Sequence, residues 1–514
     1  MLETTEPVIE QAVSGESYSE ILRSSALVGG SSVISIAIGI VRTKVIAILL
    51  GPAGFGLFGV LGSIANLFQC LAGMGVNSSG VRQIAYATGS GDSAQIAQTA
   101  TALRRTSILL GVFGAVLLFL LSRPVSRLTF GGEQYAHAIS FLSIAVFFQV
   151  LSNGQAALIQ GMRRIVDFAK NAIFGAFFGT LLAITFIYLL RERGIVPALA
   201  GIAAASLFFS WWYSKKVEIE PHHISNSQVL QQVPVLLKLG FAFMVSGFAT
   251  TGMAYFARVI VLHDVGFEAT GMYQAAWTLG GIYVGFILQT MGADFFPRLT
   301  ASIENDALCN RLVNEQTEIG LLLAGPGVIA SIALAPFLIS LFYSTKFGDA
   351  AGILRWFSVG AILQVATWPM SYIIVAKGRQ AVYLASELAW GITNFVLTWG
   401  CVRFLGLSGA GVAFVGSYVA YGIMLLPIAR RLSDFRFSSA NKKIAAVFLV
   451  SIAVVFSGFY VFPFGLAASI GTLAAVLSSV YSVRVLATLI PRERIPEAIR
   501  RTLLRFDVLL GKFR

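Results

Sequence analysis

Two cations lie inside a strongly apolar stretch near the start of this 514-residue chain. The stretch, residues 39–58, reads GIVRTKVIAILLGPAGFGLF and contains Arg42 and Lys44. A charge at the centre of a bilayer costs at least ~2.5 kcal/mol, so such residues are rare and commonly functional. Because a guanidinium group binds phosphate through paired hydrogen bonds, the pattern favours a site for an anion. The alternative is that the side chains extend to the lipid headgroups.

The two cations are not expected to form one site. Residues two apart on a helix point about 200° away from each other, so Arg42 and Lys44 face different directions. Arg42 is therefore the stronger candidate for lining a cavity, and Lys44 is the weaker one. Arg258 and Arg355, which lie near the ends of later apolar runs, complete the set of candidate cavity cations.

Three further ionisable residues are candidates for ion coupling or gating. Glu387 lies inside an apolar run, where a carboxyl group can bind H⁺ or Na⁺, although a structural pair with a neighbouring helix is the alternative. Asp294 and Arg298 are four residues apart and could form a gate, but an ordinary ion pair within one helix explains them as well.

Uncharged amides inside the apolar runs are candidates for hydrogen bonds to a polar substrate. Interhelical hydrogen bonding explains any single one of them equally well. They are Asn66, Gln69, Asn77, Gln149, Asn153, Gln155, Gln274, Gln289 and Gln364.

Enzymatic and metal chemistry find little support in the sequence. The expected outer loops contain no pair of carboxylates and no His/Asp cluster, and the chain has no HExxH, GxSxG or Walker motif. The cysteines Cys70, Cys309 and Cys401 are scattered and lack metal-ligand spacing. We therefore expect no catalytic residue, no metal and no cofactor other than a coupling ion.

The composition is that of a polytopic membrane protein. Hydrophobic residues make up 56% of the chain, charged residues only 12%, and the mean hydropathy is +0.79. A span needs about 20 mostly apolar residues, and counting such runs predicts an all-α protein with about fourteen transmembrane helices. The expected spans are 24–50, 55–84, 103–122, 137–160, 168–190, 195–213, 236–262, 268–293, 317–343, 350–376, 380–404, 407–430, 443–462 and 465–488.

The distribution of Lys and Arg predicts the orientation. When the N-terminus is placed in the cytoplasm, most of the 37 basic residues fall in cytoplasmic segments, as the positive-inside rule requires. Both termini are then cytoplasmic: an acidic tail over 1–20, which lacks the basic start of a signal peptide, and a basic tail over 489–514. The net charge of +13 is thus explained by membrane topology, and we expect no nucleic-acid partner.

A short internal repeat divides the chain. Arg42 precedes the GLF at 56–58 by 14 residues, and Arg258 precedes the GMY at 271–273 by 13. We therefore expect an N-lobe over 21–213 and a C-lobe over 236–430, each of six helices and related by pseudo-symmetry. A cytoplasmic linker over 214–235 joins them, and two extra helices follow over 443–488. Paired halves of this kind are typical of alternating-access transporters.

The run IVRTKVIAILLGPAGFGLFGVLGSI resembles the first helix pair of the multidrug/oligosaccharidyl-lipid/polysaccharide exporter superfamily. The likeness is greatest to its polysaccharide-transporter branch, which includes the O-antigen flippases. Further similar segments are LIQGMRRIVDFAK at 158–170, TGMYQAAWTLGG at 270–281 and ADFFPRLTA at 293–301.

The resemblance implies a flippase in the bacterial inner membrane, with a cation-rich central cavity. Its substrate would be an undecaprenyl-pyrophosphate-linked oligosaccharide, an O-antigen, capsule or exopolysaccharide unit, moved from the inner to the outer leaflet with an ion gradient as the driving force. Membrane lipids, and a glycan polymerase and glycosyltransferases of the same pathway, would be its partners. Two alternatives stay open: a lipid II or drug exporter of the same superfamily, and a membrane-embedded glycan polymerase or ligase.

Overall fold

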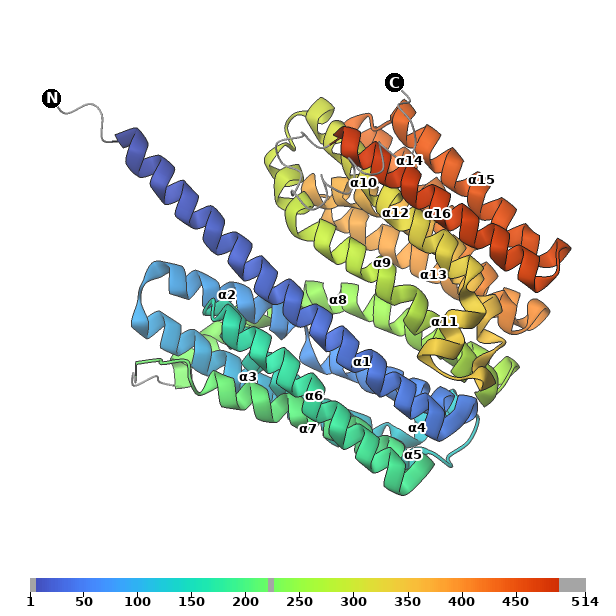
Figure 1. The fold of residues 1–514 in the computed structure, drawn as a ribbon. Helices are drawn as coiled ribbons and strands as arrows, with labels where there is room; N and C mark the ends of the chain where they lie inside the picture. Colours follow the sequence, from blue (N-terminus) through green and yellow to red (C-terminus); the bar gives the residue numbers. More distant parts are fainter. Residues whose placement is uncertain (1–5, 221–225, 490–514) are drawn as a thin grey trace. The chain divides into compact units, whose positions relative to one another are not determined.

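The described part of the chain is built of helices and turns. The computed structural model describes residues 6–220 and 226–489, and within these ranges no β-strand occurs (Figure 1). The helices are α1 Glu6–Gly73, α2 Val76–Ser90, α3 Ser93–Leu120, α4 Ser122–Phe130, α5 Ala136–Gly161, α6 Ile165–Leu190, η1 Arg191–Gly194, α7 Ile195–Ser214, α8 Asn226–Asp264, α9 Phe267–Ala301, α10 Asp306–Ala333, α11 Ala335–Phe342, η2 Thr345–Phe347, α12 Ala350–Ala376, α13 Gln380–Leu405, α14 Leu407–Ser433, α15 Ser439–Val461 and α16 Phe464–Leu489.

The predicted polytopic all-α fold is confirmed. Within the described residues, 11 helical segments are long and apolar enough to cross a membrane. Two of them, Gly29–Gly73 with 45 residues and Ile165–Ser214 with 50, each cover two of the expected spans. The helix count is therefore roughly consistent with the predicted fourteen spans.

A glycine divides α1 into the two spans that the sequence predicts. Gly51 has φ 68° and ψ −177°, a conformation that L-residues with a Cβ rarely adopt, so the helix is interrupted there. Pro52 follows directly, where its fixed φ and missing N–H suit the first turn of a new helix. Gly266, with φ 102°, makes the corresponding turn between α8 and α9.

The predicted second span, 55–84, is wrong in its extent. The helix ends at Gly73, and Met74 and Gly75 adopt left-handed conformations before α2 begins at Val76. A Cβ at position 75 would overlap the carbonyl oxygen of Gly240 in α8, so the chain turns where two backbones approach closely. The apolar pattern continues through this turn, which is why hydropathy alone missed it.

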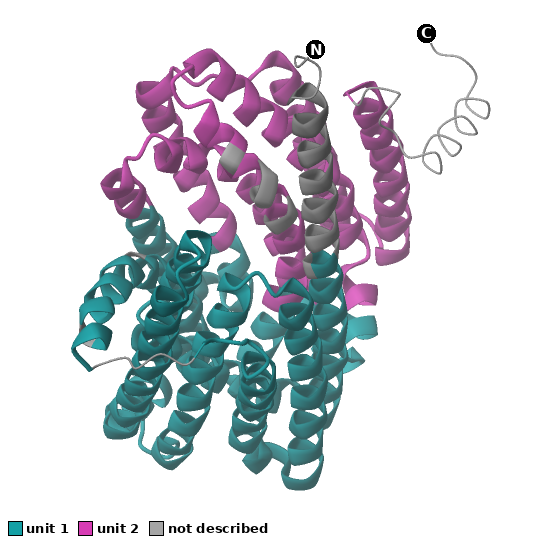
Figure 2. Ribbon diagram, turned by 90° about the vertical axis from the view of Figure 1, so that its left-hand side faces the viewer, with its two compact units in different colours: residues 1–276, 339–350, 387–413 teal, residues 277–338, 351–386, 414–514 magenta. Residues whose placement is uncertain are grey.

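The chain divides into two compact units. Figure 2 shows unit 1, residues 1–276, 339–350 and 387–413, in teal, and unit 2, residues 277–338, 351–386 and 414–514, in magenta. The predicted lobe boundaries remain a prediction, but α8 begins at Asn226, inside the expected linker. Helix α1 begins at Glu6, inside the expected N-terminal tail. The expected C-terminal tail lies outside the described residues, apart from Leu489.

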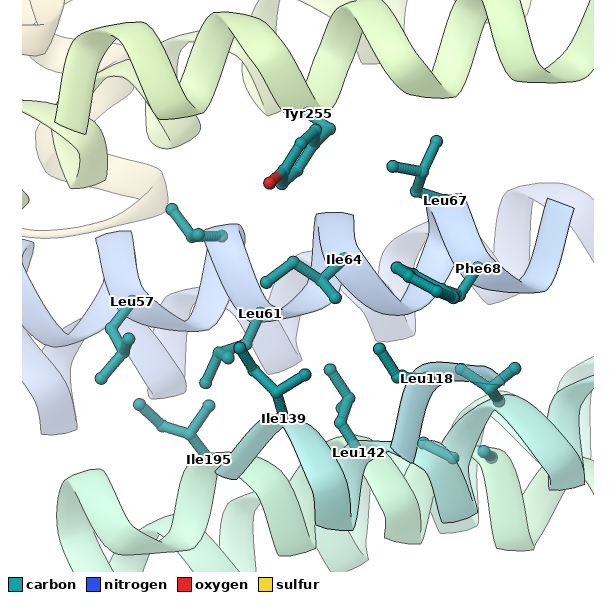
Figure 3. Packing of buried hydrophobic residues seen from close by; sticks show 14 of the residues in the cluster. Leu57, Leu61, Ile64, Leu67, Phe68, Leu118, Ile139, Leu142, Ile195 and Tyr255 are labelled. Atoms are coloured by element: carbon teal, nitrogen blue, oxygen red, sulfur yellow. The ribbon is translucent and has the colours of Figure 1, made fainter. Parts of the chain in front are cut away.

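The second half of α1 forms the centre of the unit 1 core. Leu61 and Ile64 are buried against Leu118, Ile139 and other apolar residues of α3, α5, α7 and α8 (Figure 3). In unit 2, α15 and α16 pack on α10: Phe448 of α15 covers Gly325, and Gly471 of α16 lies against Ala333. The two helices predicted beyond the C-lobe are thus part of the unit 2 core.

Candidate functional site

Arg258 is buried in unit 1 and fully engaged by its neighbours. Its side chain is 7% exposed, and Nε donates to Oε1 of Gln274 at 2.6 Å. Nη1 donates to the carbonyl oxygen of Ala254, and the guanidinium carbon lies 5.9 Å from the centre of the Tyr273 ring. This predicted cavity cation therefore links α8 to α9 in the structure.

The α8–α9 turn places the partners of Arg258. The N–H of Gly266 donates to the carbonyl oxygens of Val261 and Leu262, both at 3.1 Å, and closes α8. Thr270 then donates from both its N–H and its hydroxyl to the carbonyl of Gly266, which starts α9. As a result, Gln274 lies about two turns inside α9 and reaches back to Arg258.

The same turn packs directly on α1. A Cβ at Gly56 would overlap the carbonyl oxygen of Phe267, and one at Gly271 would overlap that of Pro52. A Cβ at Gly59 would lie 2.8 Å from Oε1 of Gln274. The two sequence repeats, GLF at 56–58 and GMY at 271–273, are therefore in contact with each other inside unit 1.

Arg42 has a different environment from its repeat partner. It is half-buried on α1, and its Nε is buried without a hydrogen-bond partner among the described residues. When the two repeats are aligned on Gly56 and Gly271, the residue equivalent to Gln274 is Gly59, which has no side chain to offer. The first repeat thus has no counterpart of the Gln274 amide, and the Nε of Arg42 has no acceptor among the described residues.

The other cations of the predicted set lie apart from this pair. Lys44 is half-buried and makes no hydrogen bond or ion pair within residues 6–220 and 226–489. Arg355, in unit 2, donates from Nε to the carbonyl oxygen of Ile332 at 3.2 Å and lies 3.7 Å from the centre of the Phe459 ring. It therefore joins α10, α12 and α15, and a binding role for it remains a prediction.

The predicted coupling residues stay untested. Glu387 is half-buried on α13, and Arg298 is exposed on α9. The side chain of Asp294 lies outside the described residues, so its expected pair with Arg298 remains a prediction.

Three of the candidate amides line one small cavity in unit 1. Gln69 from the end of α1, Asn77 from α2 and Asn153 from α5 surround a space of about 150 Å³, together with Ser78 and Ser107. Gln149 donates to Asn153 at 3.2 Å. Sequence reasoning identified these amides singly, but their grouping depends on the turn at Met74–Gly75, which it missed.

Comparison with known proteins identifies the fold. A lipid II flippase, MurJ, in an inward closed conformation aligns with a TM-score of 0.70 at 15% identity, over 90% of this chain and 99% of that one. An inward-facing multidrug resistance MATE family transporter aligns with a TM-score of 0.65 at 18% identity, over 80% and 99%. The fold is therefore that of multi-pass membrane transporters such as these two.

The sequence comparisons are more specific. The model of a family described as polysaccharide biosynthesis proteins matches residues 45–352. A lipid III flippase of Escherichia coli is 23% identical over 79% of this chain and 98% of its own length. The succinoglycan biosynthesis transport protein ExoT of Rhizobium meliloti is 22% identical over 72% and 71%.

The chain belongs to this polysaccharide biosynthesis family, in the polysaccharide-transporter branch of the exporter superfamily that its first helix pair resembles. The relatives are named as flippases and transport proteins, in agreement with the prediction that the chain is not an enzyme.

Proposed function

We propose that this protein is a flippase for an undecaprenyl-pyrophosphate-linked oligosaccharide in the bacterial inner membrane. Its family and the two named relatives support a lipid-linked glycan as the substrate class. The observation that carries the proposal at the site is the buried Arg42 Nε without a partner among the described residues, in a span that is mostly apolar.

The chemistry of that donor suits the proposed substrate. A pyrophosphate group is doubly charged and cannot cross hydrocarbon unassisted. An arginine that lacks an internal acceptor can form charge-assisted hydrogen bonds to it, which are roughly twice as strong as neutral ones. The cavity around Gln69, Asn77 and Asn153 offers amides for sugar hydroxyls. The lipid tail remains in the bilayer throughout.

The direction and the driving force belong to the same proposal. From the distribution of Lys and Arg, we assign both termini to the cytoplasm. We propose that the substrate moves from the inner to the outer leaflet by alternating access. Glu387 is our candidate for H⁺ or Na⁺ coupling. Cationic drugs are disfavoured as substrates because the candidate site contributes arginine donors.

The experiment places the gene in a strain that lacks its own flippase for a surface glycan. We expect the chain to restore glycan display, and lipid-linked units to accumulate on the cytoplasmic face without it. Lipid-linked units that stay on the cytoplasmic face when the chain is present would contradict the proposal, because a polymerase or ligase would leave them there. The alternative that the protein is a lipid II flippase is tested in the same way, in a strain that lacks its own lipid II flippase.

A further inference from the structure

A groove on unit 1 adjoins the amide-lined cavity at Ser107 and Gly154 and joins a basic end to an aromatic one. Two cavities of about 240 and 480 Å³ adjoin between α3, α5 and α7. They share Leu151, Gln155 and Trp211 among their lining residues, so they form one continuous groove.

The basic end carries two cations without an acidic partner. Arg104 and Lys215 line the smaller cavity, and both side chains are exposed. Lys215 Nζ lies 3.7 Å from the centre of the Trp211 ring, and neither cation forms an ion pair within the described ranges. Gln155 accepts a hydrogen bond from Ser210 at 2.7 Å through Oε1, which leaves its amide N–H groups for an acceptor in the groove.

The neighbouring cations of this basic surface either do not line the groove or have polar partners elsewhere. Arg105 donates to Oδ1 of Asn226 at 2.7 Å, and Arg164 pairs with Asp167 at 2.6 Å. Lys216 lies over the ring of Tyr213 at 4.8 Å, and neither Arg105 nor Lys216 lines the groove. Arg104 and Lys215 are therefore distinguished from these neighbours because they line the groove.

The other end of the groove is apolar and open to lipid. Phe148, Ala204, Leu207 and Phe208 line it, and Phe208 and Trp211 are 50% and 42% exposed within a membrane-spanning segment. The helical run from Ala204 to Lys215 is about 17 Å long at ~1.5 Å per residue. That is close to half of the ~30 Å hydrocarbon core, the depth of one leaflet.

We propose that this groove is a binding site for an anionic phospholipid of the surrounding bilayer. The phosphate lies between Arg104 and Lys215 and accepts from Gln155, and one acyl chain follows Leu151, Leu207 and Phe208. Basic pockets between transmembrane helices bind anionic headgroups in this way. The length of one leaflet favours an acyl chain over the much longer chain of a polyprenyl carrier. The inference does not depend on which substrate the protein transports.

The test measures lipid binding to the purified full chain by native mass spectrometry. We expect phosphatidylglycerol to bind at least tenfold more tightly than phosphatidylcholine of the same chains. The double variant R104A/K215A should lose this preference, whereas R104K/K215R should keep it. R105A/K216A removes two nearby cations that do not line the groove, and we expect it to bind like the unmodified protein. Phe208→Ala should weaken binding of both lipids while preserving the preference.

Four results would overturn the proposal. The first is equal binding of the two phospholipids, and the second is a preference that R104A/K215A retains. The third is displacement of phosphatidylglycerol by undecaprenyl phosphate at equal concentration, because the groove would then hold the carrier lipid. We expect that inorganic phosphate alone does not displace phosphatidylglycerol. Full displacement by phosphate, the fourth result, would show that the groove binds phosphate only and not a lipid.

Discussion

At the scale of single residues, Arg42 and Arg258 occupy equivalent places in the two repeats but have opposite surroundings. Arg258 donates to Gln274 and Ala254, whereas the Arg42 Nε has no acceptor within the described residues. Gln274 supplies the side-chain acceptor in the second repeat, whereas the residue three positions after Gly56 is Gly59, which has no side chain. We therefore assign Arg258 mainly to holding the helix pair together, and Arg42 to the substrate anion.

Substitution of Arg42 tests that assignment in cells. Arg42→Ala should lower glycan display about tenfold or more at normal protein level, since a charge-assisted hydrogen bond contributes ~1.5–3 kcal/mol. Arg42→Lys retains the charge but loses the paired hydrogen-bond geometry. Its glycan display should therefore lie between that of the unmodified protein and that of Arg42→Ala. Lys44→Ala is the matched control on the same helix, and an equal loss in that variant would assign the effect to membrane anchoring.

Substitution of Gln274 tests the structural role of Arg258. Gln274→Ala leaves a buried guanidinium without its side-chain acceptor, which should reduce stability by ~1–3 kcal/mol. The measurement is the apparent Tm of the purified protein in detergent. Gln149→Ala, which removes a single half-buried contact to Asn153, should change the Tm much less. Equal Tm values for the two variants would mean that Arg258 needs no partner.

At the scale of elements, the contact between α1 and the start of α9 depends on glycine. Gly56 and Gly271 allow each helix to touch the backbone of the other, and the turns at Gly51 and Gly266 set the angles at which they meet. Small residues of this kind let transmembrane helices approach closely.

A bulkier residue at this crossing should be poorly tolerated. Gly56→Val would place side-chain atoms against the Phe267 carbonyl, a backbone atom that cannot move aside cheaply, and overpacking of this kind costs ~1–3 kcal/mol. We expect less folded protein and a Tm lower by several degrees. Gly39→Val on the same helix meets nothing within 4 Å and serves as the control. A Gly56→Val protein as stable as the control would show that the helices are not in close contact.

Much of this arrangement could be predicted from the sequence, because span length and charge depend on local composition. The runs at 137–160, 195–213 and 350–376 match α5, α7 and α12 closely. The break at Met74–Gly75 could not be predicted from the sequence, because it follows from contact with Gly240, a residue far along the chain. For the same reason Arg258 and Gln274 could each be named from the sequence, but the hydrogen bond between them could not be predicted.

At the scale of the whole molecule, the chain consists of two compact units, each with its own buried core. Unit 1 contains Arg42, Arg258, the amide-lined cavity and the proposed lipid groove. Unit 2 contains Arg355 and the α10–α15–α16 core. Most of the candidate substrate contacts thus lie in unit 1, and we expect substitutions there to affect transport more than substitutions in α15 and α16.

The most direct measurement is lipid flipping by the purified protein. Proteoliposomes are loaded with a fluorescent undecaprenyl-pyrophosphate oligosaccharide, and an impermeant quencher reports how much of it reaches the other leaflet. We predict rapid movement with the unmodified protein and an ion gradient, and a rate at least tenfold lower with Arg42→Ala. Equal rates for the two proteins, or no movement above protein-free liposomes, would contradict the account.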